Sequence, residues 1–193
     1  IRAKHIVIAT GAHAAIPQIS GAEYGETSDD VFAWEALPKS VAVVGAGYIA
    51  VELAGVLHTL GVKTDLFVRR DRPLRNFDSY LIDGLVAEME KSGPSLHAHK
   101  IPERVEKLPD GQLQLYFQDG SSHIAERIIW AIGRKPNVQG LNLDAAGVTL
   151  NDRGFIAVDE YQNTVVPGIY ALGDVTGEKE LTPVAIKAGR TLS

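Results

Sequence analysis

The fold of this chain is decided by the stretch SVAVVGAGYIAVELAG, which occupies residues 40–55. It opens with an apolar run, Val41–Val44, of the length expected for a buried parallel strand. A glycine-rich turn follows and leads into a segment with helical periodicity. A G-x-G-x-x-A pattern in this context is typical of a turn that binds the pyrophosphate of a dinucleotide. The pattern consists of Gly45, Ala46, Gly47, Tyr48, Ile49 and Ala50.

Each small residue of this turn has a physical role. Gly45 permits the tight turn, and Gly47 lets the backbone come close to a pyrophosphate. Ala50 is small enough for close contact between the helix and the strand. The N-terminus of the helix adds unpaired N–H groups and the positive end of the helix dipole. We therefore expect a dinucleotide here rather than a purely structural turn.

The helix that follows should bury one apolar face, and Gly61 stands where a left-handed cap would end it. A second strand is predicted at Thr64–Val68, which completes a βαβ unit. The predicted apolar face consists of Ile49, Leu53, Val56, Leu57 and Leu60.

The residues after the second strand indicate which nucleotide is bound. NAD-binding folds place an acidic residue there to bond the ribose 2′-hydroxyl, whereas NADP-binding folds place arginine. This chain has Arg69 and Arg70 at that place, with Arg72 and Arg75 close behind. Guanidinium groups bind a 2′-phosphate through paired hydrogen bonds, which favours NADP(H). Asp71 keeps the alternative open, since its carboxylate could accept a bond from a hydroxyl.

Composition sets limits on the function. The chain has 193 residues, a formal net charge of −5 and no cysteine. The negative charge argues against nucleic acid or an anionic membrane as a partner. No apolar run has transmembrane length and no signal peptide is present, so we expect a cytoplasmic protein. Cysteine ligands and thiol chemistry are excluded within these residues. The histidines show no metal spacing beyond His97-x-His99, so no metal site is predicted.

The remaining patterns predict further elements. Ile6–Gly11 is expected to be a short buried strand that ends in small residues, and a helix should begin after an N-cap at Asp78. Its apolar face is predicted at Leu81, Ile82, Leu85, Val86 and Met89. Antiparallel strands are predicted at 104–108, 112–118 and 123–126, further strands at 127–132, 155–158 and 169–172, and a last helix from Thr182 and Pro183.

Six segments together resemble the flavin-dependent pyridine nucleotide-disulfide oxidoreductases, and within that family the members that reduce glutathione disulfide. They occur in the family's order and cover nearly the whole chain. The segments are Ala9–Gly11, Val43–Gly55, Val68–Arg75, WAIGRKPN at 130–137, GIYALGD at 168–174 and LTPVA at 181–185.

The resemblance implies an α/β fold in which an NADPH-binding domain interrupts an FAD-binding domain. Residues 1–13 would end the first FAD-domain segment, residues 14–134 would form a Rossmann-like NADP(H) domain with an antiparallel meander, and residues 135–193 would begin the second FAD-domain segment. The first flavin-binding glycine motif, the redox-active cysteine pair and a dimer-forming interface domain would lie outside these residues. The chain therefore reads as the middle of a longer homodimeric protein, inactive by itself.

The resemblance also implies roles for particular residues. Tyr48 matches an aromatic lid over the flavin, and Glu52 matches a carboxylate that pairs with a lysine near the flavin. Arg190 matches an arginine that contacts glutathione disulfide. The implied nucleotide contacts are Gly45, Ala46, Gly47, Ile49, Ala50, Arg69, Arg70, Arg75, Gly133 and the backbone of Glu180. The implied flavin contacts are Ala9, Thr10, Gly11, Gly173, Asp174, Leu181 and Thr182.

Two alternatives remain at this stage. One is another member of the family, such as a trypanothione or mercuric reductase. The other is a binding module that holds NADP without turnover, which the absence of cysteine favours.

Overall fold

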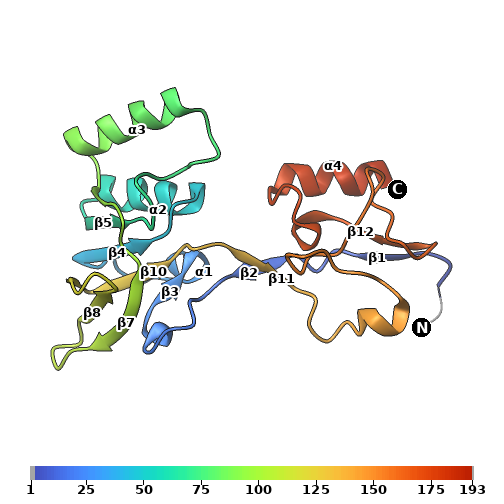
Figure 1. Ribbon diagram of the computed structural model, residues 1–193, viewed down its shortest axis with the longest axis horizontal. Helices are drawn as coiled ribbons and strands as arrows, with labels where there is room; N and C mark the ends of the chain where they lie inside the picture. Colours follow the sequence, from blue (N-terminus) through green and yellow to red (C-terminus); the bar gives the residue numbers. More distant parts are fainter. Residues whose placement is uncertain (1–2, 193) are drawn as a thin grey trace. The chain divides into compact units, whose positions relative to one another are not determined.

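The structure is a computed structural model that describes residues 3–192 (Figure 1). The chain forms two compact units, which are described one at a time. Unit 1 combines the outer segments, Ile1–His13 and Arg134–Ser193. Unit 2 is the continuous middle segment, Ala14–Gly133. The sequence placed Arg134 at the end of the middle part, whereas in the structure it belongs to the outer segments.

Unit 2 is built on a five-stranded parallel sheet. The strand order is β3-β10-β4-β5-β6, so the strand before the glycine turn, β4, lies at the centre. In open parallel sheets of this Rossmann-like kind, ligands bind beyond the carboxyl ends of the strands. The strands are β3 (Glu26–Thr27), β4 (Ser40–Val44), β5 (Lys63–Phe67), β6 (Ser95–His97) and β10 (Arg127–Trp130).

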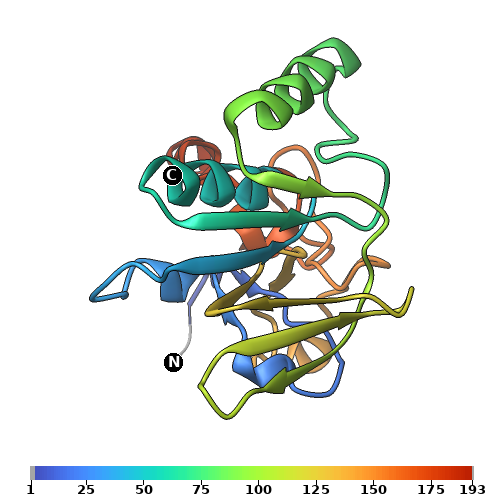
Figure 2. The same cartoon turned by 90° about the vertical axis from the view of Figure 1, so that its left-hand side faces the viewer.

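Both faces of the central strand are buried. Val41 and Val43 belong to a core shared with α2 (Tyr48–Thr59) and α3 (Ser79–Ser92). Ala42 and Val44 point to the opposite face and belong to a second core. A strand covered on both sides reads as a continuous apolar run, as this one does. Figure 2 looks onto unit 2, with the two helices above the sheet and antiparallel strands below it.

The second face of the sheet is covered by an antiparallel meander. Its strands are β7 (Pro102–Lys107), β8 (Leu113–Phe117) and β9 (Ser122–Ala125). Leu115 and Phe117 of β8 pack with the fully buried Trp130 of β10. The indole Nε1–H of Trp130 donates to the carbonyl of Ala22 at 2.8 Å, which satisfies its one buried donor. The predicted α/β class with a parallel sheet and a meander is therefore confirmed.

The predicted helix positions are confirmed more closely than their predicted buried faces. Asp78 caps α3, since its carboxylate accepts the backbone N–H of Tyr80 at 2.9 Å. The prediction was wrong for Leu81 of α3, for Val56 of α2 and for Leu60 just after α2, which are exposed. Helix α2 approaches the sheet through small side chains instead, and its buried residues are Ala50, Ala54 and Leu57.

Unit 1 contains short strands and one longer helix. Strands β1 (Ile6–Ile8) and β12 (Ile169–Ala171) form a parallel pair. Strand β2 (Ala12–Ala14) pairs with β11 (Arg134–Pro136). The core of this unit includes Leu143, Val148, Ile156, Ala171 and Val175. The remaining elements are the 3₁₀ turns Leu143–Ala146 and Gly173–Thr176, and α4 (Thr182–Leu192).

Two predictions for unit 1 were wrong. Ile6 and Val7 of β1 are about half exposed rather than buried, because β1 pairs with only one strand. The predicted strand at Phe155–Val158 does not form a ladder. Its backbone makes an isolated bridge from Ile156 to Leu150, and the N–H of Ile156 donates to Val175.

The two ends of unit 2 lie next to each other. The N–H of Ala15 donates to the carbonyl of Gly133 at 2.9 Å, so the middle segment starts and finishes at one place. The short helix α1 (Ser28–Val31) comes after the first of these ends in the sequence. Among residues 3–192, no helix combines the length and the apolar character needed to cross a bilayer.

Candidate functional site

Three loops of unit 2 leave the carboxyl ends of adjacent parallel strands. The glycine turn follows β4, the arginine loop (residues 69–75) follows β5, and Gly133 lies shortly after β10. Because β10, β4 and β5 are neighbours in the sheet, these loops share one edge. These loops carry the sequence-predicted nucleotide residues of unit 2, on the side where open parallel sheets bind their ligands. The residues are Gly45, Ala46, Gly47, Ile49, Ala50, Arg69, Arg70, Arg75 and Gly133.

The first glycine of the turn is required by close backbone contact. A Cβ at Gly45, whose φ is 156°, would lie 2.1 Å from the carbonyl oxygen of Ala131. The N–H of Gly45 donates to Phe67 at 3.0 Å, which ties the turn to β5. No residue with a side chain fits there without moving the neighbouring strand end.

The second glycine faces open space. A Cβ at Gly47 would meet no atom within 4 Å, and Gly47 is itself the N-cap residue of α2. No side chain caps this helix, so its first backbone N–H groups are available to an anion. Ala50 is fully buried against the sheet and allows the close approach of the helix. These features fit a bound pyrophosphate.

The arginine loop carries exposed cations. Within the described residues, the side chains of Arg69, Arg70 and Arg75 form no ion pair, whereas Arg72 pairs with Asp83 at 2.6 Å. The loop is held against the glycine turn by a backbone bond from the N–H of Leu74 to the carbonyl of Ala46, at 2.7 Å. The free guanidinium groups and the pyrophosphate turn are therefore parts of one connected surface.

In unit 1, a partly buried cluster of charged side chains follows strand β12. The guanidinium of Arg134 is 3.5 Å from the carboxylate of Asp174 and 3.4 Å from that of Glu180, and it donates to the carbonyl of Ala12 at 2.6 Å. Partial burial raises the pKa of the Glu180 carboxyl, and the charge of Asp174 adds to this, while Arg134 and Arg153 oppose it. Arg134 thus holds two of the predicted cofactor residues together.

The segment after β1 is held by one asparagine. Asn137 donates its backbone N–H to Gly11 and its side-chain amide to Thr10, both at 2.9 Å, and its carbonyl accepts from the Thr10 hydroxyl at 2.7 Å. Its side-chain oxygen also lies 2.6 Å from Nδ1 of His13. Ala9 and Thr10 are exposed, and Gly11 has a φ of 73°. This network fixes the small-residue turn that the sequence assigned to the flavin.

The other predicted flavin residues lie at two helix ends of unit 1. Gly173 opens the turn Gly173–Thr176 with a φ of 75°. Leu181 and Thr182 are exposed at the start of α4, which is the end that offers backbone N–H groups. Arg190 is exposed in the last turn of the same helix.

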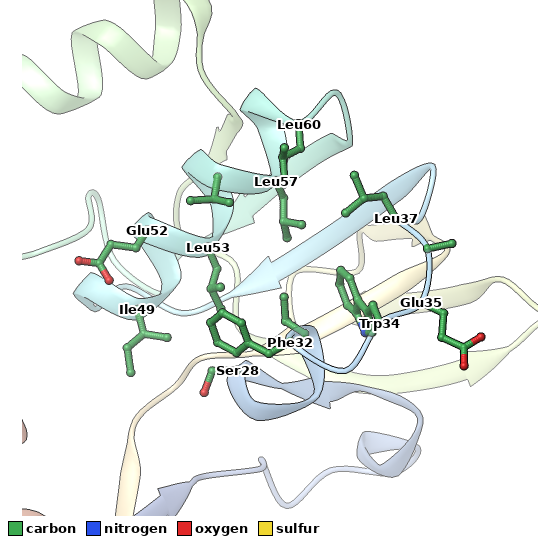
Figure 3. A pocket seen from close by; sticks show the side chains of 13 residues that line it. Ser28, Phe32, Trp34, Glu35, Leu37, Ile49, Glu52, Leu53, Leu57 and Leu60 are labelled. Carbon is green, nitrogen blue, oxygen red and sulfur yellow. The ribbon is translucent and has the colours of Figure 1, made fainter. Parts of the chain in front are cut away.

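Tyr48 and Glu52 lie in the first half of α2. Tyr48 is 37 % exposed. Glu52 is exposed at the edge of an apolar groove between α1 and α2, and Figure 3 shows its carboxylate pointing away from the apolar side chains. The groove has a volume of about 650 Å³. Its lining includes none of Arg69, Arg70 and Arg75, and it shares only Ile49 with the predicted nucleotide residues. Its lining includes Phe32, Trp34, Leu37, Ile49, Leu53, Leu57 and Leu60.

One buried charge in unit 2 was not predicted. Asp65 of β5 is 5 % exposed and accepts from Nε2 of His97 at 2.7 Å, while Nε2 of His123 lies 3.4 Å from its other oxygen. Burial lowers the pKa of His123, against the opposing pull of Asp65. Across residues 3–192, no three His, Cys, Asp or Glu side chains form a group able to hold a metal ion.

Sequence reasoning missed the residues that hold the site in place, including Leu74, Arg134 and Asn137. Arg134 and Asn137 belong to the segment WAIGRKPN, which was noticed as a whole, but nothing in it showed which partners they have. Leu74 carries no sequence signal at all, since leucine is common in every kind of structure.

The fold and these loops define a class. A family model described as pyridine nucleotide-disulphide oxidoreductase matches residues 1–189, and the chain belongs to this family. Among its curated relatives are glutathione reductase of Schizosaccharomyces pombe, 50 % identical over 193 residues, and glutathione reductase of Yarrowia lipolytica, 47 % identical over 194 residues. Each alignment covers 99 % of this chain, but only 42 % and 41 % of the relatives.

Solved structures give the same class. The copper(II) complex of the HOCl-induced flavoprotein disulfide reductase RclA from Escherichia coli superposes with a TM-score of 0.90 at 26 % identity, over 98 % of this chain and 43 % of that one. LpdA from Mycobacterium tuberculosis gives a TM-score of 0.88 at 28 % identity, over 97 % and 41 %. The chain thus spans less than half the length of these proteins.

Proposed function

We propose that this chain is the nucleotide-binding middle part of an NADPH-dependent, FAD-containing disulfide reductase whose substrate is glutathione disulfide. The observation that carries the proposal is the joined edge of unit 2, where the Leu74–Ala46 bond links free arginines to an open pyrophosphate turn. The relatives named glutathione reductase support the choice of reaction. The full protein would act as a homodimer, which the family resemblance implies.

The nucleotide is assigned to unit 2. Gly45 lets the strand turn sharply, Gly47 leaves room for the pyrophosphate, and the uncapped end of α2 supplies N–H donors. Arg69 and Arg75 would bind the 2′-phosphate, and Arg70 adds positive charge beside them. Gly133, with a φ of 137° and open space at its Cβ position, would line the nucleotide pocket with backbone.

The flavin is assigned to unit 1. Asp174 would accept bonds from ribityl hydroxyls, held by Arg134. Thr182 and Leu181 would present backbone N–H groups to the electron-rich edge of the flavin ring. The Thr10–Gly11 turn offers a close backbone approach. When both groups are bound, NADPH supplies a hydride and FAD accepts it.

The remaining residues would control access and substrate. Tyr48 would exclude water from the flavin until the nicotinamide enters, and Glu52 would pair with a lysine elsewhere in the protein. The backbone of Glu180 would contact the nicotinamide. Arg190 would bind a carboxylate of glutathione disulfide, which makes it the specificity residue of the proposal.

A second candidate is a module that binds NADP without turnover, and the lack of cysteine in these residues favours it. The two candidates are separated by the full-length protein. A disulfide reductase should purify with a flavin absorption spectrum and should consume NADPH when glutathione disulfide is added. A colourless protein that binds NADPH without turnover would overturn the enzyme proposal in favour of the module.

A further inference from the structure

The conformation of the arginine loop depends on an unusual backbone residue. Leu74 has a φ of 54°, which lies in the left-handed region. Residues other than glycine, asparagine and aspartate rarely adopt this backbone conformation. Leucine gains nothing from this conformation itself, so the surrounding structure must hold it there. Among the described residues, the other non-glycine cases are His99, Asn142 and Gln162.

The bond made by Leu74 explains what the conformation achieves. With this φ, its N–H reaches the carbonyl of Ala46 in the glycine turn, at 2.7 Å. Its own carbonyl accepts the N–H of Phe77 at 2.8 Å, and the preceding Pro73 is buried. The loop therefore turns back onto the glycine turn immediately before Arg75.

A second left-handed residue holds the other end of the loop. His99 has a φ of 58°, and its N–H donates to the carbonyl of Arg70 at 3.1 Å. The next residue, Lys100, donates its N–H to Val68 at 3.0 Å. Two of the four left-handed side-chain residues of the described structure thus hold this one loop in place. Arg72 is paired with Asp83, whereas Arg69, Arg70 and Arg75 form no ion pair within the described residues.

A phosphorylated ribose makes this spacing important. In a dinucleotide, the 2′-phosphate and the pyrophosphate are attached to the same ribose, so their separation is fixed by covalent geometry. Charge-assisted bonds to both groups form together only if the guanidinium groups stand at the matching distance from the pyrophosphate turn. The Leu74–Ala46 bond directly joins the two parts of the protein that would hold these groups.

We propose that Leu74 is a positioning residue that sets the preference for a 2′-phosphorylated nucleotide. Its left-handed backbone fixes Arg69 and Arg75 relative to the glycine turn, and His99 supports the same loop from the other side. This inference rests on the proposed function, since it deepens the assignment of NADP(H) to this edge.

The test changes the backbone preference and leaves the charges in place. In the full-length protein, Leu74→Ile keeps the volume but adds a branched Cβ, which disfavours the left-handed region. Leu74→Asn favours that region. Affinities for NADP⁺ and NAD⁺, and for 2′,5′-ADP and 5′-AMP, are measured by calorimetry at low salt.

We expect Leu74→Ile to weaken NADP⁺ and 2′,5′-ADP by about fivefold or more, with NAD⁺ and 5′-AMP changed by less than about twofold. The Leu74→Asn protein should prefer NADP⁺ over NAD⁺ much more strongly than the Leu74→Ile protein does. The matched control is Gln162→Ile, which puts the same penalty at a φ of 66° in unit 1 and should leave the preference unchanged. His99→Val repeats the test should Leu74→Ile fail to fold.

The possible failures are distinguishable. A wild-type protein that binds both nucleotides equally would overturn the cofactor assignment and this inference with it. A wild-type preference that survives in a folded Leu74→Ile or His99→Val protein would overturn only the inference. Equal weakening of all four ligands would also overturn it, because the loop would then shape the pocket without selecting the phosphate.

Discussion

Arg69 and Arg75 carry the predicted choice between the two nicotinamide nucleotides. Both side chains are exposed and form no ion pair within the described residues, so neither must give up a protein partner to bind a phosphate. A charge-assisted hydrogen bond contributes roughly 1.5–3 kcal/mol. Solvent screening at an exposed site reduces this contribution.

The double variant Arg69→Met, Arg75→Leu tests this choice. We expect the Michaelis constant for NADPH to rise by roughly one to three orders of magnitude while that for NADH barely changes. The penalty should shrink as salt increases. Steady-state kinetics of the full-length enzyme measure both. The control variant Lys91→Met, Lys107→Met removes two positive charges from α3 and β7. If the arginine variant lost affinity for NADPH and NADH equally, Arg69 and Arg75 would have a structural role.

His123 gives the stability of unit 2 a pH dependence. Burial lowers its pKa in the folded state below the usual 6.5, and His97 and Lys63 act in the same direction, while Asp65 opposes them. The unfolded chain therefore holds more protons as the pH falls below 6.5. The contribution to stability is complete above that pH and is lost as the pH falls through the folded-state value.

A His123→Gln variant should lose part of this dependence. Its free energy of unfolding should decrease less than that of the wild type when the pH falls below 6.5. Urea denaturation on both sides of that pH provides the measurement. His99→Asn removes an exposed histidine as the control. Identical pH profiles for wild type and His123→Gln would rule out this residue as the source.

At the level of elements, the two glycines of the turn have different roles: Gly45 is required for the fold, and Gly47 leaves space for the ligand. Gly45→Ala would place a Cβ 2.1 Å from the Ala131 carbonyl, so β4 or β10 must move. A glycine-only backbone and such an overlap together cost more than about 1–3 kcal/mol. Gly47→Ala meets nothing within 4 Å and has a φ of −87°, which alanine adopts readily.

We therefore expect opposite behaviour from the two variants. Gly45→Ala should lower the unfolding temperature clearly. Gly47→Ala should fold almost like the wild type and bind NADPH at least about tenfold more weakly, because its methyl group occupies the space assigned to the pyrophosphate. Thermal melts and nucleotide titrations make the comparison. Unchanged affinity in Gly47→Ala would move the pyrophosphate away from this turn.

The sequence predicted the elements of unit 2 better than their faces. The strand, turn and helix around Gly45 follow from local pattern, and so does the cap at Asp78, because each depends on neighbours in the chain. The burial of Ala54 rather than Leu60 depends on how closely α2 approaches β4, which periodicity does not contain. Likewise, the left-handed Leu74 results from a bond to a residue in another loop.

At the level of the whole molecule, unit 2 has the properties of an independent domain. It has its own sheet, covered on both faces by its own cores, and its ends are joined by the Ala15–Gly133 bond. The assignment of unit 2 to NADP(H) and of unit 1 to FAD stays a prediction. The sequence motifs suggested where the chain crosses between them, but the crossing at Arg134 depends on partners in unit 1.

The excised segment Ala14–Gly133 should fold alone and bind NADPH. Calorimetry should show one cooperative unfolding transition, and NADPH should raise its temperature. Binding to the folded segment adds about 2.7 kcal/mol to the free energy of unfolding when the nucleotide concentration is a hundred times the dissociation constant. The same segment with Arg69→Met and Arg75→Leu should be stabilised far less. A segment that remains unfolded with NADPH present would show that unit 2 depends on the rest of the chain.

The hydrogen bond between Ala15 and Gly133 also has a consequence for the order of events during folding. Strands β1 and β12 pair although all of unit 2 lies between them in the chain. While unit 2 is unfolded, that pairing must close a long, flexible loop, and the entropy cost grows with the logarithm of loop length. Once unit 2 has folded, its own contacts hold the two ends together and the loop is effectively short. The middle of the chain should therefore acquire protection from hydrogen exchange first, and pulse labelling that finds β1 and β12 protected earlier would contradict this order.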